Sequence, residues 1–302
     1  MLDILIRAGC LATIVLLGYV LRKIGFFDEH AFPMLSKIVL RITLPATVVA
    51  GFADKQIDLS LLTLFLLALG CGGLQMFLGW LTNRRRGRKA AAFGVLNTTG
   101  YNIGCFSLPF VQSFLEPAGL IATSIFDTGN AMICLGCNYG VAASVQEGKG
   151  LSLRRIGLAL VRSVPFMTYL IMLILTLAKL RLPGPVLSLA ETISGGNAFL
   201  AMLMIGTGIR LEADRSKLWQ IAKVLLIRNA MAAVLSLVVY FLLPFELAVR
   251  QALVILFFSP IASAAPAYTG ELNNDVGLAS TINSASILCS IPVIILLLAV
   301  ML

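Results

Sequence analysis

Asp127 and Asn130 are the residues whose type and spacing most clearly indicate chemistry, because they lie three residues apart within an apolar segment. That spacing places both side chains on neighbouring parts of one helical face. A carboxylate within an apolar helix can bind and release a proton, or ligate a sodium ion together with amide and carbonyl oxygens. It can also form a fixed hydrogen bond to exposed N–H groups. Asp127 is therefore a candidate ion-binding residue, with a structural role as the alternative.

A second feature lies just before these residues, where segment 97–109 interrupts an apolar run with glycines, amides and a proline. Backbone groups freed by such a break find no water in a membrane, so the break is tolerable only in a protein interior or beside a wet cavity. Segment 260–270 repeats this pattern with Pro260, Pro266 and small residues. One proline in an apolar helix is usually a kink, but two breaks in matching positions favour a binding site.

The amides and hydroxyls near these breaks suit an anionic ligand, because they donate hydrogen bonds without the desolvation cost of a full charge. The second half of each broken helix would also present the positive end of its dipole to the break. Our candidate ligand-binding residues are Asn97, Gly100, Asn102, Gly104, Asn130, Ser263, Pro266 and Asn283.

The composition indicates the elements that must position these residues. Apolar residues make up 59% of the chain and charged residues 12%, and the mean hydropathy is +0.96. Such values predict an all-α integral membrane protein. At about twenty residues per crossing, we expect ten spans. They lie near residues 4–21, 31–52, 60–81, 89–115, 118–143, 157–178, 190–209, 222–244, 250–270 and 276–301.

The arrangement of the spans predicts both the topology and the domains. Connections near 22–23, 82–89, 147–155 and 210–223 are rich in Lys and Arg, which marks the cytoplasmic side. Both termini are therefore expected outside. The formal net charge of +9 is then explained by topology and by attraction to anionic membrane lipid. The chain divides into residues 1–150 and 151–302, with five spans each. An odd number of spans makes the second half an inverted repeat of the first.

The residue inventory argues against several other classes of protein. An intramembrane aspartyl protease needs two acids to share a proton, and Asp127 alone lies deep within a predicted span. His30, the single histidine, stands beside Asp28 and Glu29 in a predicted loop. No phosphate-binding glycine loop or zinc-ligand cluster occurs in the sequence, so we expect no enzyme, no cofactor and no structural metal. The dispersed basic residues also do not predict a nucleic-acid partner.

These features together resemble the auxin efflux carrier superfamily, which includes bacterial malate and malonate permeases and plant auxin carriers. The likeness covers the full chain and rests on Leu44-Pro45 and on segments 97–109, 126–131, 201–206 and 263–292. The sequence departs from the family at one point: four residues separate Gly104 from Pro109, where the family often has a compact Gly-Leu-Pro.

The resemblance implies a fold similar to sodium/bile-acid symporters and sodium/proton antiporters. In that fold spans 1, 2, 6 and 7 form a scaffold, spans 3–5 and 8–10 form a transport core, and broken spans 4 and 9 cross. It implies a secondary transporter of a small organic anion, with a carboxylate as the expected substrate, in the plasma (inner) membrane, and with Asp127 coupling transport to a proton or sodium ion. A homodimer is compatible with it. The alternatives are a sodium/proton exchanger without organic substrate, and a channel or membrane sensor.

Overall fold

A computed structural model describes residues 2–52, 62–148, 150, 153–210 and 217–302, and within these ranges the chain is helical and contains no strand. The start of the predicted span 60–81 and parts of the basic connections 147–155 and 210–223 lie outside the described residues. The all-α prediction is confirmed for the described part. The helices are α1 (Leu2–Lys23), α2 (Ala31–Ile38), α3 (Leu44–Phe52), α4 (Leu62–Leu81), α5 (Arg88–Thr98), α6 (Leu108–Phe114), α7 (Pro117–Met132), α8 (Asn138–Glu147), α9 (Leu153–Val161), α10 (Val164–Leu177), α11 (Gly184–Ser194), α12 (Asn197–Gly208), α13 (Leu218–Leu242), α14 (Leu247–Phe257), α15 (Ala265–Glu271) and α16 (Val276–Met301).

Short, wider π-helical segments join some of these helices into longer rods. Segment η1 (Val39–Thr43) links α2 to α3, and η5 (Ile133–Cys137) links α7 to α8. A third segment, η4 (Ile103–Ser107), leads into α6. Such segments often mark functional sites in helices.

Seven helical segments in the described part are long and apolar enough to cross a membrane. This finding agrees with the predicted class of integral membrane protein, whereas the total of ten spans and the inverted repeat stay predictions. The seven are Leu5–Lys23, Ala31–Phe52, Thr63–Leu81, Pro117–Glu147, Gly184–Gly208, Leu218–Leu242 and Val276–Met301.

The other three predicted spans, 89–115, 157–178 and 250–270, coincide with interrupted helices. For 89–115 and 250–270 the interruption confirms the breaks expected from sequence, between α5 and η4 and between α14 and α15. The uninterrupted span expected at 157–178 is a correction. There α9 ends at Val161 and a new helix begins at Val164, because the Ser163 side chain accepts a hydrogen bond from the Phe166 N–H and Pro165 occupies the first turn.

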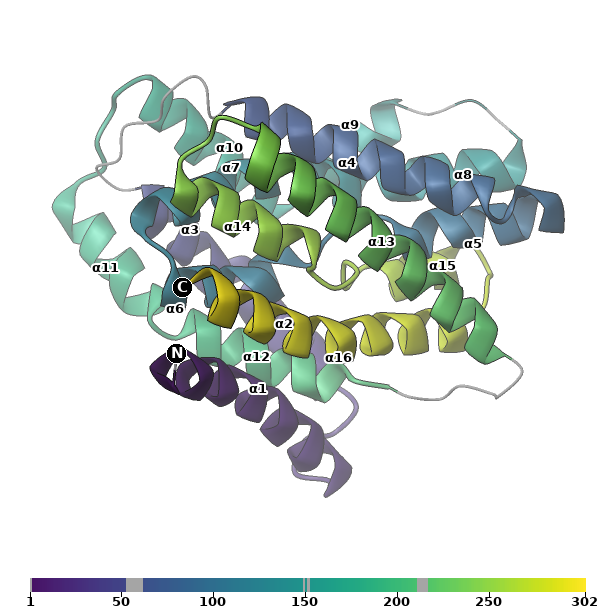
Figure 1. The fold of residues 1–302 in the computed structure, drawn as a ribbon, viewed down its shortest axis with the longest axis horizontal. Helices are drawn as coiled ribbons and strands as arrows, with labels where there is room; N and C mark the ends of the chain where they lie inside the picture. The colour runs from purple at the N-terminus through teal and green to yellow at the C-terminus, as the bar shows by residue number, and fades with distance from the viewer. Residues whose placement is uncertain (1, 53–61, 149, 151–152, 211–216) are drawn as a thin grey trace.

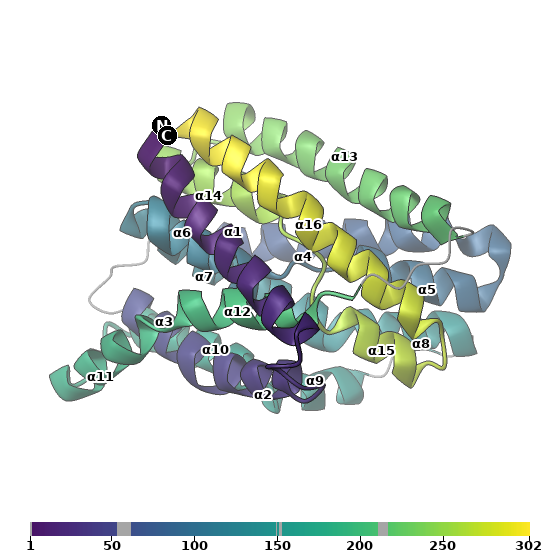
Figure 2. The same cartoon turned by 90° about the horizontal axis from the view of Figure 1, so that it is seen from below.

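A further correction concerns the predicted span 190–209, which begins earlier and is made of two helices. Helix α11 starts at Gly184, and Gly195 and Gly196 separate it from α12. Glycine has little preference for helical backbone, which explains why the turn falls there. Figure 2 shows α12 beside α1, and this contact is close. A Cβ at Gly18 or Gly206 would overlap a carbonyl oxygen of the other helix, so glycine is required at both positions.

The views in Figures 1 and 2 show a bundle in which the two chain ends lie near each other. Helices α13, α14 and α16 lie together, while α2, α3, α10, α11 and α12 form a second group of contacts. Buried aromatic side chains belong to the core of the bundle, among them Phe106, Phe126 and Tyr169.

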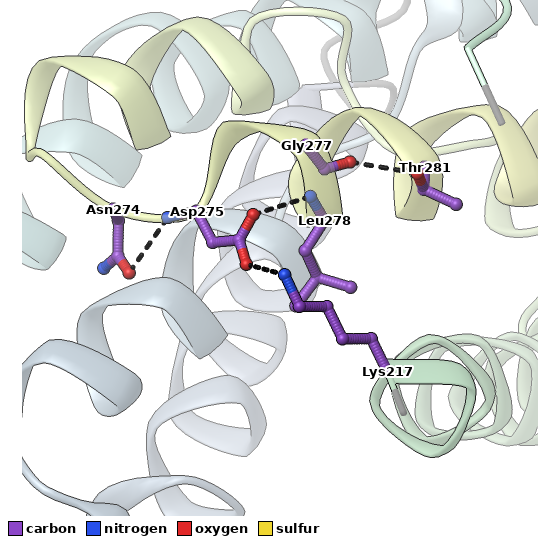
Figure 3. Close-up of polar contacts among 6 residues, drawn as sticks. All are labelled: Lys217, Asn274, Asp275, Gly277, Leu278 and Thr281. Atoms are coloured by element: carbon purple, nitrogen blue, oxygen red, sulfur yellow. Dashed lines mark hydrogen bonds and ion pairs between the residues drawn. The ribbon is translucent and has the colours of Figure 1, made fainter. Parts of the chain in front are cut away.

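The start of α16 is defined by a capping interaction at its N-terminus (Figure 3). Asp275 Oδ1 accepts a hydrogen bond of 2.9 Å from the Leu278 N–H. Its Oδ2 forms an ion pair of 2.6 Å with Lys217, which precedes α13. These contacts position the start of α16 against that of α13.

Candidate functional site

The two helix breaks meet directly, although they are far apart in sequence. The backbone N–H of Asn102, in the first break, donates to the carbonyl of Pro260 in the second at 2.9 Å. The Asn102 side-chain amide donates to Ser263 Oγ at 2.9 Å. The hydroxyls of Ser107 and Ser259 also hydrogen-bond each other. The two broken segments therefore contact each other through both backbone and side-chain hydrogen bonds, and this contact is here called the crossing.

Asn130 and Gln75 satisfy the exposed backbone of the first break. Asn130 Oδ1 accepts from the Tyr101 N–H at 3.0 Å, and its Nδ2 donates to the Tyr101 carbonyl at 2.8 Å. Gln75, on α4, accepts from the Gly100 N–H at 2.7 Å. Gly100 has a φ of +84°, which favours glycine. The side-chain amides thus replace the helical hydrogen bonds that the break removes.

Two residues of α16 do the same for the second break. The Asn283 amide donates to the carbonyl of Ile261 at 3.0 Å and, less closely, to that of Ala262 at 3.4 Å. Ser286 Oγ accepts from the Ile261 N–H at 3.1 Å. Both breaks therefore have their backbone polar groups bound by an asparagine from the following long helix.

Asp127 lies beside the crossing and is 6% exposed. Its Oδ2 accepts a hydrogen bond of 2.7 Å from the Tyr169 hydroxyl on α10, and its Oδ1 accepts one of 2.8 Å from Asn130 Nδ2. A Cβ at Gly104 would lie 3.4 Å from Asp127 Oδ2, so the first break approaches this carboxyl group closely. Asp127 is thus connected to the break through Asn130 and to α10 through Tyr169.

A cavity of about 160 Å³, here called the central cavity, adjoins these groups. Five of the candidate residues line it, and the rest of its wall is mainly apolar, with Leu40, Leu44, Cys134 and Met204. Asp127 and Asn130 supply oxygens that could bind a hard cation there. Among the described residues, no group of three or more His, Cys, Asp or Glu side chains could hold a metal ion. The candidates on the wall are Asn102, Gly104, Asp127, Asn130 and Ser263.

Four other candidate residues lie near the crossing but do not line the central cavity. Asn97 is fully buried and donates to the Phe93 carbonyl at 3.0 Å and to Thr269 Oγ1 at 3.1 Å, so it joins α5 to α15. A Cβ at Gly100 would overlap Cys134 Sγ. The other two are Pro266, in the first turn of α15, and Asn283, bound to the second break. Their contacts shape the crossing from outside the cavity.

Arg228, on α13, is a residue at the crossing that the sequence reasoning missed. It is 6% exposed, and its guanidinium donates to the carbonyls of Thr98 at 2.6 Å, Gly100 at 3.0 Å and Ser259 at 3.0 Å. It also lies 5.3 Å from the centre of the Tyr101 ring. The signal was present, because an arginine within the apolar segment 222–244 marks a functional candidate by itself.

A larger cavity of about 710 Å³, here called the outer cavity, lies between α8, α9 and α15. Exposed Arg154 and Arg162 are on its wall, together with Tyr139, Tyr268 and Glu271. Leu135 lines both cavities, and its carbonyl accepts a hydrogen bond of 3.5 Å from the Tyr268 hydroxyl. The outer cavity therefore adjoins the central one at Leu135.

Comparisons with known proteins find that the sequence is similar to membrane transporters. Residues 10–149 match the family described as "Membrane transport protein". An uncharacterized transporter of Methanothermobacter thermautotrophicus is 25% identical over 206 residues, which are 66% of this chain and 65% of that protein. The match thus spans slightly less than two thirds of the relative's length. The match over residues 10–149 agrees with the resemblance inferred from the sequence, and this part of the chain is similar to the family of membrane transport proteins.

Proposed function

We propose that this transporter is a secondary carrier that moves a small organic anion, a mono- or dicarboxylate, by alternating access at the crossing. The observation that carries the proposal is the contact of Asn102 with Pro260 and Ser263, which joins two interrupted helices on the wall of one cavity. Broken helices meeting at a substrate site are typical of secondary transporters.

The chemistry of the central cavity supports an anion of small size. Asn102 and Ser263 supply an amide and a hydroxyl that can donate to a carboxylate, and Leu40, Leu44 and Met204 supply apolar contacts for a short carbon chain. The volume of about 160 Å³ is below the 300 to 1,000 Å³ of typical drug-sized pockets. A carboxylate of a few carbon atoms fits such a space better than a bulky ligand.

The contacts at the two breaks support an inverted repeat of residues 1–150 and 151–302. In each half, an asparagine of the fifth predicted span binds the broken fourth span: Asn130 in the first half and Asn283 in the second. A polar side chain of the third predicted span does so too: Gln75 in the first half and Arg228 in the second. Equivalent contacts from equivalent spans are expected from repeated units.

The route to the central cavity in this proposal passes through the outer cavity. Arg154 and Arg162 would attract an anion there, and movement of the wall near Leu135 would admit it. This assigns α9 and its basic residues to the cytoplasmic side.

The carrier would lie in the plasma (inner) membrane with both chain ends outside. Tags at either end should therefore react with impermeant reagents on intact cells.

Asp127 is the residue that we assign to ion coupling, by protonation or by binding sodium. Its position on the cavity wall would let the substrate and the ion influence each other. The same position favours a second candidate function, a sodium/proton exchanger without organic substrate, because a buried carboxylate on the wall of a cavity can bind a proton and a sodium ion in turn.

Counterflow in proteoliposomes tests the proposal and separates these candidates. Purified protein is reconstituted into liposomes that are loaded with one unlabelled carboxylate. Uptake of labelled mono- and dicarboxylates is then measured with and without sodium at two pH values. The carrier should show saturable accelerated exchange with one class of carboxylate. Sodium-driven proton movement without carboxylate exchange would support the exchanger instead, and rapid non-saturable flux would indicate a channel.

A further inference from the structure

Three carbonyl oxygens from the two breaks converge on one cation at the crossing. Thr98 ends α5 and Gly100 follows it in the first break, while Ser259 follows α14 in the second. The last carbonyls of a helix have no partner within that helix, and they carry the negative end of its dipole. Two such negative ends would repel each other where the breaks meet. The guanidinium of Arg228 lies between them and binds all three oxygens.

Carbonyl oxygens of broken membrane helices are also the ligands that hard metal cations prefer. Here they are bound by a side chain of the protein. Arginine suits this position because its guanidinium is planar, stays charged and carries five N–H donors that can reach several acceptors at once. Arg228 is buried, and among the described residues no carboxylate pairs with it. Its charge is therefore compensated by the carbonyl ends and by the Tyr101 ring.

We propose that Arg228 is the fixed cation of this crossing: its guanidinium takes the place that a bound metal ion would otherwise fill among the carbonyls of Thr98, Gly100 and Ser259. The two breaks then stay joined whether or not a coupling ion is bound. Arg228 does not line the central cavity, so it is a positioning residue. It acts on the cavity through Tyr101, whose ring it contacts and whose backbone is bound by Asn130. The link to transport rests on the proposed function, whereas occupancy of the carbonyl site does not.

This assignment restricts where a coupling ion can bind. If Arg228 permanently fills the carbonyl site, any coupling ion must use other oxygens, and those of Asp127 and Asn130 line the central cavity. The crossing would then contain one permanent positive charge and one carboxyl group, joined through Asn130 and Tyr101.

Chemical rescue tests the occupancy of the carbonyl site without any need for substrate. In Arg228→Ala, low millimolar guanidinium should enter the vacated space and raise the thermal unfolding temperature in a saturable way, because a ligand that binds only the folded state stabilises it. Arg22→Ala is the matched control. Arg22 also donates to two carbonyls, those of Thr207 and Ile209, neither of which belongs to a helix break. Equal responses of the two variants to guanidinium, or no response of Arg228→Ala, would overturn the proposal.

A second pair of variants covers the case in which Arg228→Ala does not fold. Arg228→Lys keeps the charge with a smaller donor group, and Arg228→Gln keeps donors without charge. If the charge is what the carbonyl ends require, the lysine variant should unfold at a higher temperature than the glutamine variant. A glutamine variant as stable as the wild-type protein would refute a role for the cation.

Transport then tests the positioning role. We expect Arg228→Lys to lower carboxylate exchange by about 10- to 100-fold, which is the usual effect of residues that orient a binding group indirectly. Guanidinium should restore part of the exchange in Arg228→Ala and none in Arg22→Ala. If wild-type protein exchanges no carboxylate, the proposed function fails, while the thermal experiment still decides whether Arg228 fills the site. Normal exchange in every Arg228 variant would overturn the positioning role alone.

Discussion

The hydroxyl of Tyr169 on α10 donates a hydrogen bond of 2.7 Å to Oδ2 of Asp127 on α7. Tyr169 is 1% exposed and Asp127 6%, so water does not compete strongly for this bond. The bond connects the predicted scaffold, which includes span 6, to the predicted transport core, which includes span 5. A relative movement of these groups during the proposed transport cycle would have to break or shift this bond, which would make Asp127 responsive to conformation.

Replacing Asp127 with Asn should abolish the coupling of transport to an ion and leave folding intact. Asparagine has nearly the same shape and can still accept from Tyr169, but it neither titrates nor carries a charge for a cation. Exchange in proteoliposomes at several pH values and sodium concentrations measures the effect. Unchanged pH and sodium dependence in the variant would show that Asp127 is structural.

Replacing Tyr169 with Phe should lower stability by about 1 to 3 kcal/mol, the usual cost of losing a hydrogen bond to a charged group or leaving its partner unsatisfied. The ring can keep its packing, so the protein should still fold. We expect the pH dependence of transport to shift as well, because one of the two donors to Asp127 is lost. Thermal unfolding of Asp127→Ala, which removes the acceptor, of Tyr169→Phe and of the double variant would show whether the two effects are coupled. Additive effects would contradict the coupling.

A side chain at Gly104 should obstruct the central cavity. A Cβ there would lie 2.7 Å from Leu44 Cδ2, so Gly104→Leu must displace the cavity wall next to Asp127. We expect transport to fall much more than expression. Gly70→Leu on α4 is the control, since nothing lies within 4 Å of a Cβ at that position. If Gly104→Leu carries substrate as well as Gly70→Leu does, the central cavity is not the transport site.

Pro266 and its break can be tested in the same assay. Proline removes a backbone donor, and Pro266 stands in the first turn of α15 after the break. We expect Pro266→Leu to allow a more continuous helix and to reduce transport more than expression. Normal transport by this variant would indicate that Pro266 is a kink residue without a role in the carrier.

The outer cavity predicts an electrostatic effect on substrate affinity. Arg154→Gln and Arg162→Gln should raise KM for an anionic substrate and leave the maximal rate nearly unchanged, because in the proposed route both side chains would attract the anion before it reaches the central cavity. The increase should shrink at high ionic strength. Lys23→Gln, at the end of α1, is a control for general loss of positive charge. An equal increase in KM for all three variants would argue against a specific entry route.

The cap of α16 should make the stability of the protein depend on pH, independently of transport (Figure 3). The hydrogen bond from Lys217, followed by that from the Leu278 N–H, holds the pKa of Asp275 below its ordinary value. A carboxyl group with a lowered folded-state pKa stabilises the protein above its unfolded-state pKa and loses this contribution as the pH falls through the folded-state value. Stability should therefore decline below about pH 4, the ordinary pKa of Asp.

Variants of Asp275 separate the cap from the ion pair. Asp275→Ala should cost about 1 kcal/mol at neutral pH, the typical value for a lost N-cap. Asp275→Asn keeps a capping oxygen and loses the exposed ion pair, which contributes about 0 to 1 kcal/mol. Chemical unfolding at neutral and acidic pH measures both. If the alanine variant retains the acid sensitivity of wild type, Asp275 does not contribute to it.

The sequence by itself determined the elements of this protein and the positions of the two breaks. Apolar runs of membrane length, interrupted near Gly100 and Pro260, are local properties. Helix α5 ends at Thr98 and α14 at Phe257, shortly before those residues. The three-residue spacing of Asp127 and Asn130 likewise predicted that both face the same side of one helix, and their hydrogen bond agrees with this. The interruptions at Ser163 and at Gly195 were missed, because their capping and turn signals lie inside apolar runs.

Only the tertiary structure decided which of these residues meet. Asn102 and Ser263 are 161 positions apart, and no local pattern specifies their contact. Packing between helices also turned Asn97 toward Thr269 and away from the central cavity, and it brought Arg228 to the carbonyl ends of both breaks. The physical reason is that hydropathy and backbone preference act over a few neighbouring residues. The partner of a buried polar group depends instead on which helices pack side by side and in what register.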